Sequence, residues 1–305
     1  MLIVTTMCKI FLAMVVGFYC RRRGIFKEGG VESISSFLVR VAAPMYIVFS
    51  MSNADRSDMK TVVTLFVAGV GIYVGMIIIS KIIFTIWKVP EDKSSVYQLM
   101  LVFSNCALMG YPVAEAFLGE NAIFYMAILN LPYNILFYSY GIYMLAKSSG
   151  KKSKLDLKLL FSAPSLVCMG ALVIYFTGIK LPVFVSESLG FVGSSMSSLS
   201  MVCIGGTIAN YSVRETLKQT SLYGVAVMRL FLIPLLVYAV LSHVITDMYL
   251  VRLATLSVAM PTGAMIAMGA IEYGGNEEAA SAGVALTTML SIVTIPIVAL
   301  AMGIA

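Results

Sequence analysis

Charged residues are scarce in this 305-residue chain. Asp, Glu, Lys and Arg together make up 12% of it, whereas hydrophobic residues make up 60%. Soluble globular domains contain about 25% charged residues, so the composition excludes an ordinary soluble protein. It predicts an integral membrane protein, because apolar segments of membrane-spanning length fill the chain and leave no room for a soluble domain.

The motifs of common enzyme classes are missing too, so we do not expect an enzyme. The sequence has no paired-histidine metal motif, no Gly-rich phosphate loop with lysine and no serine nucleophile elbow. The missing nucleotide site argues against an ATP-driven pump. The five cysteines stand singly in apolar segments, without the spacing of metal ligands. We expect no metal site and no cofactor; a proton or a sodium ion stays open as a coupling ion.

Ten apolar segments separated by turn signals predict an all-α integral membrane protein with ten transmembrane helices. A spanning helix needs about 20 mostly apolar residues, and each segment is close to that length. The predicted spans are residues 2–20, 31–51, 61–87, 95–117, 122–145, 159–178, 183–210, 217–243, 249–272 and 277–303.

The formal net charge of +6 does not indicate a nucleic-acid partner. The basic residues lie in short loops between apolar segments, where they determine the orientation of the spans. With the N-terminus outside, the inner loops hold 13 Lys and Arg residues and the outer loops hold 4. This asymmetry predicts an inner-membrane protein whose two termini both lie outside the cytoplasm.

The longest basic stretch divides the chain into halves. Residues 147–158 form a basic cytoplasmic linker, with five predicted spans in residues 1–146 and five in residues 159–305. Because five is odd, a repeated five-helix unit must insert the second time with opposite orientation. We therefore expect two inverted five-helix repeats, as in many secondary transporters, although direct sequence matches between the halves are close to chance.

Two of the spans carry a proline two residues from a glycine at membrane depth, which predicts two broken helices. A broken helix leaves backbone groups unpaired, and lipid cannot pair them. If the two breaks cross, their helix N-termini offer donors to an anion and their C-termini offer carbonyls to a cation. The candidate binding residues are Asn105, Gly110, Tyr111 and Pro112 in the fourth span and Pro261, Thr262 and Gly263 in the ninth.

Other polar residues in the spans have a functional and a structural interpretation. Asn130 and Asn134 lie one turn apart in the fifth span, so they face the same cavity or hold two helices together. Ionisable groups at membrane depth are costly and often functional. Glu115 and Glu272 are candidates to carry a proton or bind a cation, or they lie at the interface. Arg40 and Arg229 are candidates to neutralise an anion or pair with a carboxylate.

At the breaks the sequence resembles the auxin efflux carrier family in its bacterial branch. Asn105, Gly110 and Pro112 reproduce the family pattern Asn-x-x-x-x-Gly-x-Pro of the fourth span. Met260-Pro261, together with the later Tyr-Gly-Gly-Asn turn, resembles the ninth span, and the ten-span layout extends the resemblance over the whole chain. Two features depart from the plant carriers: Ser104 replaces the usual proline before the asparagine, and the central loop is only about a dozen residues long.

The resemblance implies an elevator-type secondary transporter of small organic anions. Spans one, two, six and seven would form a dimerising scaffold, and spans three to five and eight to ten a moving transport domain. Asn105 would contact a carboxylate, and bacterial members are linked with dicarboxylates such as malate and malonate. The alternatives are a cation-coupled carrier of a larger amphipathic anion, a channel, and a membrane sensor that does not transport.

Overall fold

The computed structural model describes residues 2–53, 59–148, 163–212, 216–273 and 275–304, and these residues are built from helices. The one extended pairing among them is an isolated antiparallel bridge between Ser104 and Thr262. The prediction of an all-α fold is therefore confirmed for the described residues. Most of the basic linker and the start of the sixth predicted span lie outside them.

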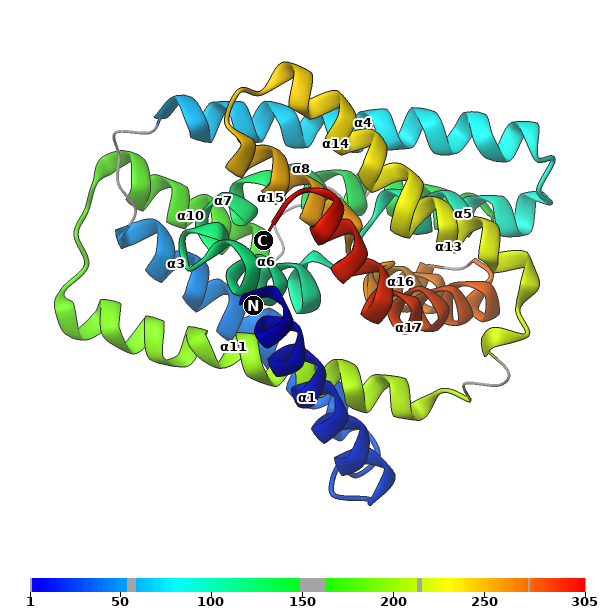
Figure 1. Cartoon of the computed structure of the whole chain (residues 1–305), viewed down its shortest axis with the longest axis horizontal. Coiled ribbons are helices and arrows are strands. Elements are labelled where there is room, and N and C mark those ends of the chain that lie inside the picture. The colour runs from blue at the N-terminus through cyan, green and yellow to red at the C-terminus, as the bar shows by residue number, and fades with distance from the viewer. Residues whose placement is uncertain (1, 54–58, 149–162, 213–215, 274, 305) are drawn as a thin grey trace.

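The first half of the described chain, shown from blue to green in Figure 1, contains helices separated by several wide, π-helical turns (η1, η3 and η4). Its elements are α1 (Leu2–Arg22), α2 (Gly30–Phe37), η1 (Leu38–Ala42), α3 (Ala43–Asn53), α4 (Met59–Ile86), α5 (Glu91–Val102), η3 (Cys106–Gly110), α6 (Tyr111–Leu118), α7 (Asn121–Leu129), α8 (Leu131–Leu136), η4 (Phe137–Gly141) and α9 (Ile142–Ser148).

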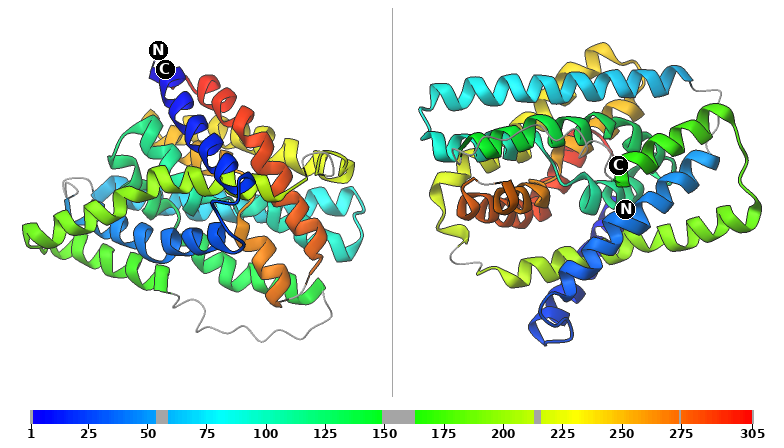
Figure 2. Two further views of the ribbon diagram at one scale, coloured as in Figure 1. Left: turned by 90° about the horizontal axis from the view of Figure 1, so that it is seen from below. Right: turned by 180° about the vertical axis from the view of Figure 1, so that it is seen from behind.

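The second half of the described chain is also built from helices joined by short irregular turns, here one 3-10 turn (η6) and one π-helical turn (η7). Its elements are α10 (Ala163–Thr177), α11 (Val183–Asn210), η6 (Thr220–Leu222), α13 (Tyr223–Val227), η7 (Met228–Leu232), α14 (Ile233–Val244), α15 (Met248–Ala259), α16 (Ala264–Tyr273) and α17 (Glu277–Ala301). The start of α1 and the end of α17 lie side by side (Figure 2).

Length and composition make this a multi-pass membrane protein. Six helical segments among the described residues are long and apolar enough to cross a membrane: Gly30–Asn53, Met59–Ile86, Asn121–Lys147, Val183–Asn210, Thr220–Val244 and Glu277–Ala301. Three shorter apolar helices, Cys106–Leu118, Met248–Ala259 and Ala264–Tyr273, flank the two interruptions described below. Ten crossings and two inverted repeats stay predictions.

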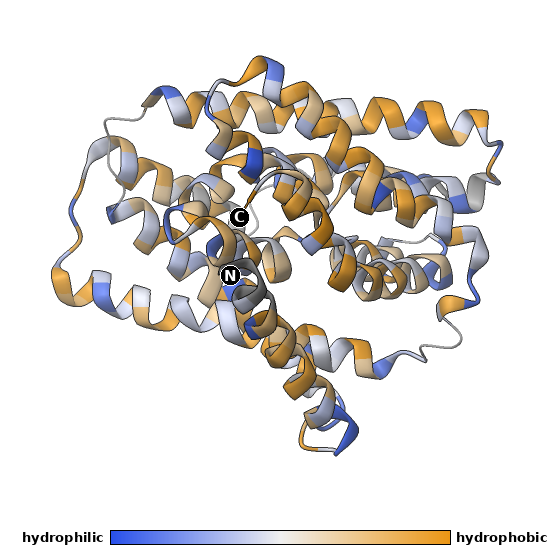
Figure 3. Ribbon diagram, viewed as in Figure 1, coloured by the Kyte–Doolittle hydropathy of each residue, from blue (hydrophilic) through white to orange (hydrophobic). Residues whose placement is uncertain are grey.

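Large apolar side chains cover the outside of the helices, as expected where lipid replaces water. Phe184 and Phe191 on α11 are 80% and 83% exposed, and Val244 on α14 is 75% exposed. Figure 3 shows hydrophobic residues along most helices and hydrophilic ones gathered at turns such as the one that follows α1. An exposed apolar surface of this extent indicates contact with a membrane.

The helices pack in two groups. In the first group α1, α2, α3, α10 and α11 pack mainly on one another. The contact of α1 with α11 is a backbone contact, because a Cβ added to Gly17 would lie 1.8 Å from the carbonyl oxygen of Val202, and one added to Gly205 would lie 1.8 Å from that of Met14. Small residues allow such close approach of membrane helices. This group contains the predicted spans one, two, six and seven.

The second group contains α4 to α9 and α13 to α17, which correspond to the remaining predicted spans. The two groups meet mainly where α6 and η3 pack against α11 and where α3 packs against α7. That one group moves against the other stays a prediction.

Three of the wide turns end two residues before a proline. Pro44 follows η1, Pro112 follows η3 and Pro234 follows η7. A proline has no N–H and crowds the carbonyl four residues earlier, so the preceding turn cannot keep regular α-helical hydrogen bonds and widens. Proline therefore explains where these helices become irregular.

Candidate functional site

Two helices are interrupted, and the interruptions meet. In the first, α5 ends at Val102, Phe103 is extended (φ −103°, ψ 109°) and the helix resumes at Cys106. In the second, α15 ends at Ala259, Met260 is extended (φ −65°, ψ 149°) and α16 begins at Ala264. Each interruption therefore creates one helix C-terminus and one helix N-terminus in the interior of the protein.

The two extended segments pair with each other as a short antiparallel ladder. The N–H of Asn105 donates a 2.7 Å hydrogen bond to the carbonyl of Pro261, and the N–H of Gly263 donates a 3.0 Å bond to the carbonyl of Phe103. Ser104 lies opposite Thr262 between these bonds. The pairing satisfies backbone groups that lipid would leave unpaired, and we call this pair of segments the crossing.

The position of the first interruption corrects one expectation. It lies at residues 103–105, not at Gly110 and Pro112. Gly110 is helical (φ −64°, ψ −49°), and Pro112 lies two residues after the π-helical turn η3, so it widens the helix without interrupting it. Both are buried with Tyr111, so these three residues pack the second half-helix rather than open it. Pro261, in contrast, lies inside the second interruption.

Asn105 begins the second half of the broken helix. Its Oδ1 accepts a 3.3 Å hydrogen bond from the N–H of Leu108, the geometry of an N-cap. The side chain is half-buried, so it keeps access to a ligand. The N-terminus that it caps carries about half a positive charge.

Thr262 and Gly263 hold the crossing in place. The N–H of Thr262 donates to Thr287 Oγ1 at 3.2 Å, and its own hydroxyl donates to the carbonyl of Met100 at 3.4 Å. The Thr262 side chain is fully buried, so it fastens the crossing to α17 and α5. A Cβ at Gly263 would lie 3.1 Å from the carbonyl oxygen of Ser104, which explains a glycine at this close backbone approach.

Asn130 and Asn134 have different surroundings. Asn130 is buried, and its Oδ1 accepts a 3.0 Å hydrogen bond from the hydroxyl of Tyr73. Its Nδ2 has no hydrogen-bond partner among the described residues. Asn134 lies on α8, which follows α7 directly after Asn130, and is half-buried.

Arg229 is the charged residue that the structure brings to the crossing. Its side chain is fully buried. Nη1 donates a 2.6 Å hydrogen bond to the carbonyl of Leu101 in the last turn of α5, and Nε donates a 3.2 Å bond to the carbonyl of Met260 just after α15. Nη1 also lies 3.8 Å from the sulfur of Met76. Arg229 thus joins the ends of both helices that lead into the crossing.

The other three ionisable candidates lie elsewhere. Glu115 on α6 is half-buried and accepts hydrogen bonds from the hydroxyls of Tyr46 on α3 and Ser197 on α11. It therefore makes a polar contact between the two helix groups. Arg40 on η1 and Glu272 on α16 are exposed, and neither belongs to the hydrogen bonds that hold the crossing together.

Several residues of the site carry no obvious signal in the sequence. Tyr73, Thr287, Tyr46 and Ser197 are uncharged polar residues within apolar helices, and their partners are distant in the chain. Ser104 adjoins Asn105 and was visible only as a departure from the family pattern. Their hydroxyl groups at membrane depth are the one signal that the sequence offers for these residues, and this signal does not identify their hydrogen-bond partners.

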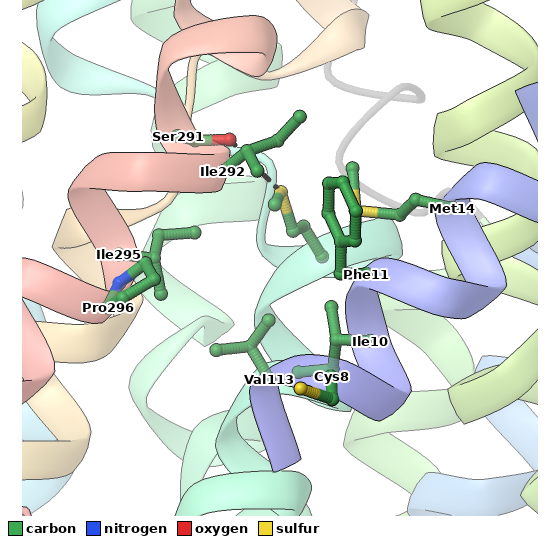
Figure 4. Close-up of a pocket in the computed structure, with 10 residues that line it drawn as sticks. Cys8, Ile10, Phe11, Met14, Val113, Ser291, Ile292, Ile295 and Pro296 are labelled. Atoms are coloured by element: carbon green, nitrogen blue, oxygen red, sulfur yellow. Dashed lines mark hydrogen bonds between the residues drawn. The ribbon is translucent and has the colours of Figure 1, made fainter. Parts of the chain in front are cut away.

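An apolar pocket of about 310 Å³ adjoins the half-helix that Asn105 caps (Figure 4). Met109 and Val113 form one wall, and α1 contributes residues such as Phe11 and Met14. The lining residues from α17 are Ser291, Ile292, Ile295 and Pro296. Ser291 donates its hydroxyl hydrogen bond to the carbonyl of Thr288 at 2.7 Å. The lining therefore suits an apolar group.

Comparison with known sequences agrees with a transport protein. The sequence pattern of a family described as membrane transport protein, the auxin efflux carrier family, matches residues 2–157 and residues 152–299. The chain belongs to this family. The match covers nearly the whole sequence, so the resemblance seen at the interruptions is confirmed.

Uncharacterized transporters from archaea and bacteria are similar to this chain. An uncharacterized transporter of Methanothermobacter thermautotrophicus is 22% identical over 298 residues, which is 96% of each chain. A second, from Methanocaldococcus jannaschii, is 24% identical over 205 residues, 64% of this chain and 66% of the relative. The uncharacterized transporter YfdV of Escherichia coli is 21% identical over 209 residues, 66% of this chain and 67% of the relative.

Proposed function

We propose that this protein is a secondary transporter of small organic anions and that the carboxylate of its substrate binds at the crossing beside Asn105. The observation that carries the proposal is the antiparallel pairing of the two interruptions. This pairing brings together the N-termini of the helices Cys106–Leu118 and Ala264–Tyr273. Each helix N-terminus carries about half a positive charge, so the two together match one carboxylate.

The substrate class is a small mono- or dicarboxylate such as malate or malonate, as the family resemblance implies. The apolar pocket beside Met109 and Val113 favours a second candidate, an amphipathic anion whose apolar part enters the pocket. An ion channel would need a continuous polar lane, whereas the polar side chains described above gather at the crossing and at Glu115. A sensor would bind an anion without moving it.

The two helix groups support an elevator mechanism. The group with the crossing would carry the anion past the group of α1, α2, α3, α10 and α11, which would serve as the scaffold and the dimer interface. The contact of Glu115 with Tyr46 and Ser197 would be broken and remade during this movement. The protein would lie in the inner membrane with both termini outside the cytoplasm, as the distribution of basic residues predicts.

Counterflow uptake into proteoliposomes tests the proposal. Vesicles are loaded with unlabelled malate, malonate or hexanoate, and uptake of the labelled compound is followed for the wild type and for Asn105→Ala. Saturable exchange that falls at least about tenfold in the variant is expected, because a hydrogen bond to a charged group contributes about 1.5–3 kcal/mol. Exchange of none of the three anions by folded protein would contradict the proposal, and linear, unsaturable flux would indicate a channel.

The matched control is Asn276→Ala. Asn276 caps α17 through a 2.9 Å hydrogen bond from the N–H of Ala279, the same geometry that Asn105 has with Leu108. Both substitutions remove an N-cap and cost about 0.5–2 kcal/mol of stability. Equal loss of exchange in the two variants would attribute the effect to stability and count against a carboxylate site at Asn105.

A further inference from the structure

The C-terminal ends of the two helices that enter the crossing share one cationic partner. α5 ends at Val102 and α15 ends at Ala259, and a carbonyl from each end accepts a hydrogen bond from Arg229. A helix C-terminus carries about half a negative charge, so the two ends together carry about one. The single charge of the guanidinium balances them.

Such helix ends are the groups with which many secondary transporters hold a sodium ion. In this protein the carbonyls of Leu101 and Met260 are already bound to a fixed positive charge. A metal ion at the same oxygens would lie next to the buried guanidinium, where two positive charges repel each other strongly because the surroundings screen little.

The unpaired polar groups of this region also suit an anion or water rather than a metal ion. Nη2 of Arg229 and Nδ2 of Asn130 have no hydrogen-bond partner among the described residues. Both are N–H donors, and a metal ion needs acceptors. They belong to one neighbourhood, because Tyr73, which contacts Asn130, and Met76, which contacts Arg229, lie one turn apart on α4.

We propose that Arg229 is a built-in cation that takes the place of a metal ion at the crossing, so that the anion is carried without co-transport of sodium or another metal cation. This inference rests on the proposed transport function. It narrows the coupling ion of that function to a proton or to none. Arg229 acts on the substrate site as a positioning residue. It fixes the C-termini of α5 and α15, and these lead into the two half-helices whose N-termini bind the carboxylate.

Transport in different salts tests the inference directly. Uptake of labelled malonate by the wild type is measured in sodium, potassium, lithium and choline salts, and the four rates are expected to agree within about twofold. Arg229→Lys keeps the positive charge, whereas Arg229→Gln keeps a hydrogen-bond donor but loses the charge. The uptake rate of the lysine variant should therefore exceed that of the glutamine variant at least about tenfold. A tenfold loss of wild-type uptake in choline, or a glutamine variant as active as the lysine variant, would overturn the inference.

Thermal unfolding of the purified protein gives a readout that does not depend on transport. A ligand that binds only the folded state raises the unfolding midpoint with its concentration. The wild-type midpoint should be the same in sodium and in choline, whereas Arg229→Gln, which removes the positive charge beside the two carbonyls, should gain a sodium-dependent rise. A sodium-dependent rise in the wild type contradicts the inference. If the wild type exchanges no anion but shows the expected midpoints, the transport proposal fails and the assignment of Arg229 stands.

Discussion

The N–H of Asn105 donates a 2.7 Å hydrogen bond to the carbonyl of Pro261, and this bond ties the two interrupted helices to each other. Pro261 contributes its carbonyl as the acceptor here, and because proline has no N–H, it leaves no donor that would need an acceptor. The same asparagine uses its side chain to cap the helix that follows. Asn105 thus connects the pairing of the two interruptions to a helix N-terminus, which carries a partial positive charge.

Gly263→Ala should weaken the crossing. The added Cβ would lie 3.1 Å both from the carbonyl oxygen of Ser104 and from the hydroxyl oxygen of Tyr133. We expect a loss of about 1–3 kcal/mol in the free energy of unfolding, as for other overpacked sites, together with reduced exchange. Unfolding in detergent and counterflow uptake measure the two effects.

The control for this substitution is Gly75→Ala on α4. A Cβ there meets no atom within 4 Å, and alanine is the better helix former by about 0.5–1 kcal/mol. The variant should be at least as stable as the wild type. If Gly263→Ala behaves in the same way, the close approach of the two segments is not needed.

Glu115→Gln should change the rate of transport and leave the apparent affinity unchanged. Glu115 joins α6 to α3 and α11, and it does not touch the crossing. Hydrogen bonds to a carboxylate are roughly twice as strong as those to a neutral amide, so the substitution weakens the contact between the two helix groups. The maximal exchange rate and KM are to be measured separately, with Glu187→Gln on the exposed face of α11 as the control.

A double substitution shows whether the effect of Glu115 passes through this contact. Tyr46→Phe removes one of the two donors to Glu115. If the two residues act together, the effect of the double substitution, measured against the wild type, should be smaller than the sum of the two single effects. Additive effects, or a change in KM alone, would disprove a role for this contact in the movement between the two groups.

Tyr73→Phe should lower stability more than it lowers affinity. The Tyr73 hydroxyl is the donor to Asn130 Oδ1, and its loss leaves a buried amide oxygen unpaired at a cost of about 1–3 kcal/mol. Thermal unfolding should show this loss, while KM should change by less than about threefold. A large rise in KM without a change in unfolding would instead place Asn130 in direct contact with the substrate.

The sequence predicts the helices well because their signals are local. Apolar length and turn residues place α11 at the predicted span 183–210, and Pro261 lies inside the second interruption as expected. The first interruption was misplaced because proline was given more weight than the cap. Pro112 widens the helix that contains it without interrupting it, whereas Asn105, whose side chain caps the N–H of Leu108, is the signal for a helix start.

The contacts between distant segments cannot be predicted from the sequence. The positions of Arg229 and Glu115 at membrane depth suggested a function for each, but not their partners. Leu101 and Met260 offer only backbone carbonyls, which no residue type reveals, and Tyr46 and Ser197 come from two other helices. Such partners depend on how the helices pack, and a single sequence carries no record of it.

The most direct test of the central claim is equilibrium binding of a labelled anion to the purified protein. Malate, malonate and hexanoate are measured against the wild type, Asn105→Ala and the capping control Asn276→Ala. The account predicts saturable binding of at least one of them to the wild type and to Asn276→Ala, and binding at least about tenfold weaker to Asn105→Ala. Equal binding by all three proteins, or equal loss in both variants, would contradict a carboxylate site at the crossing.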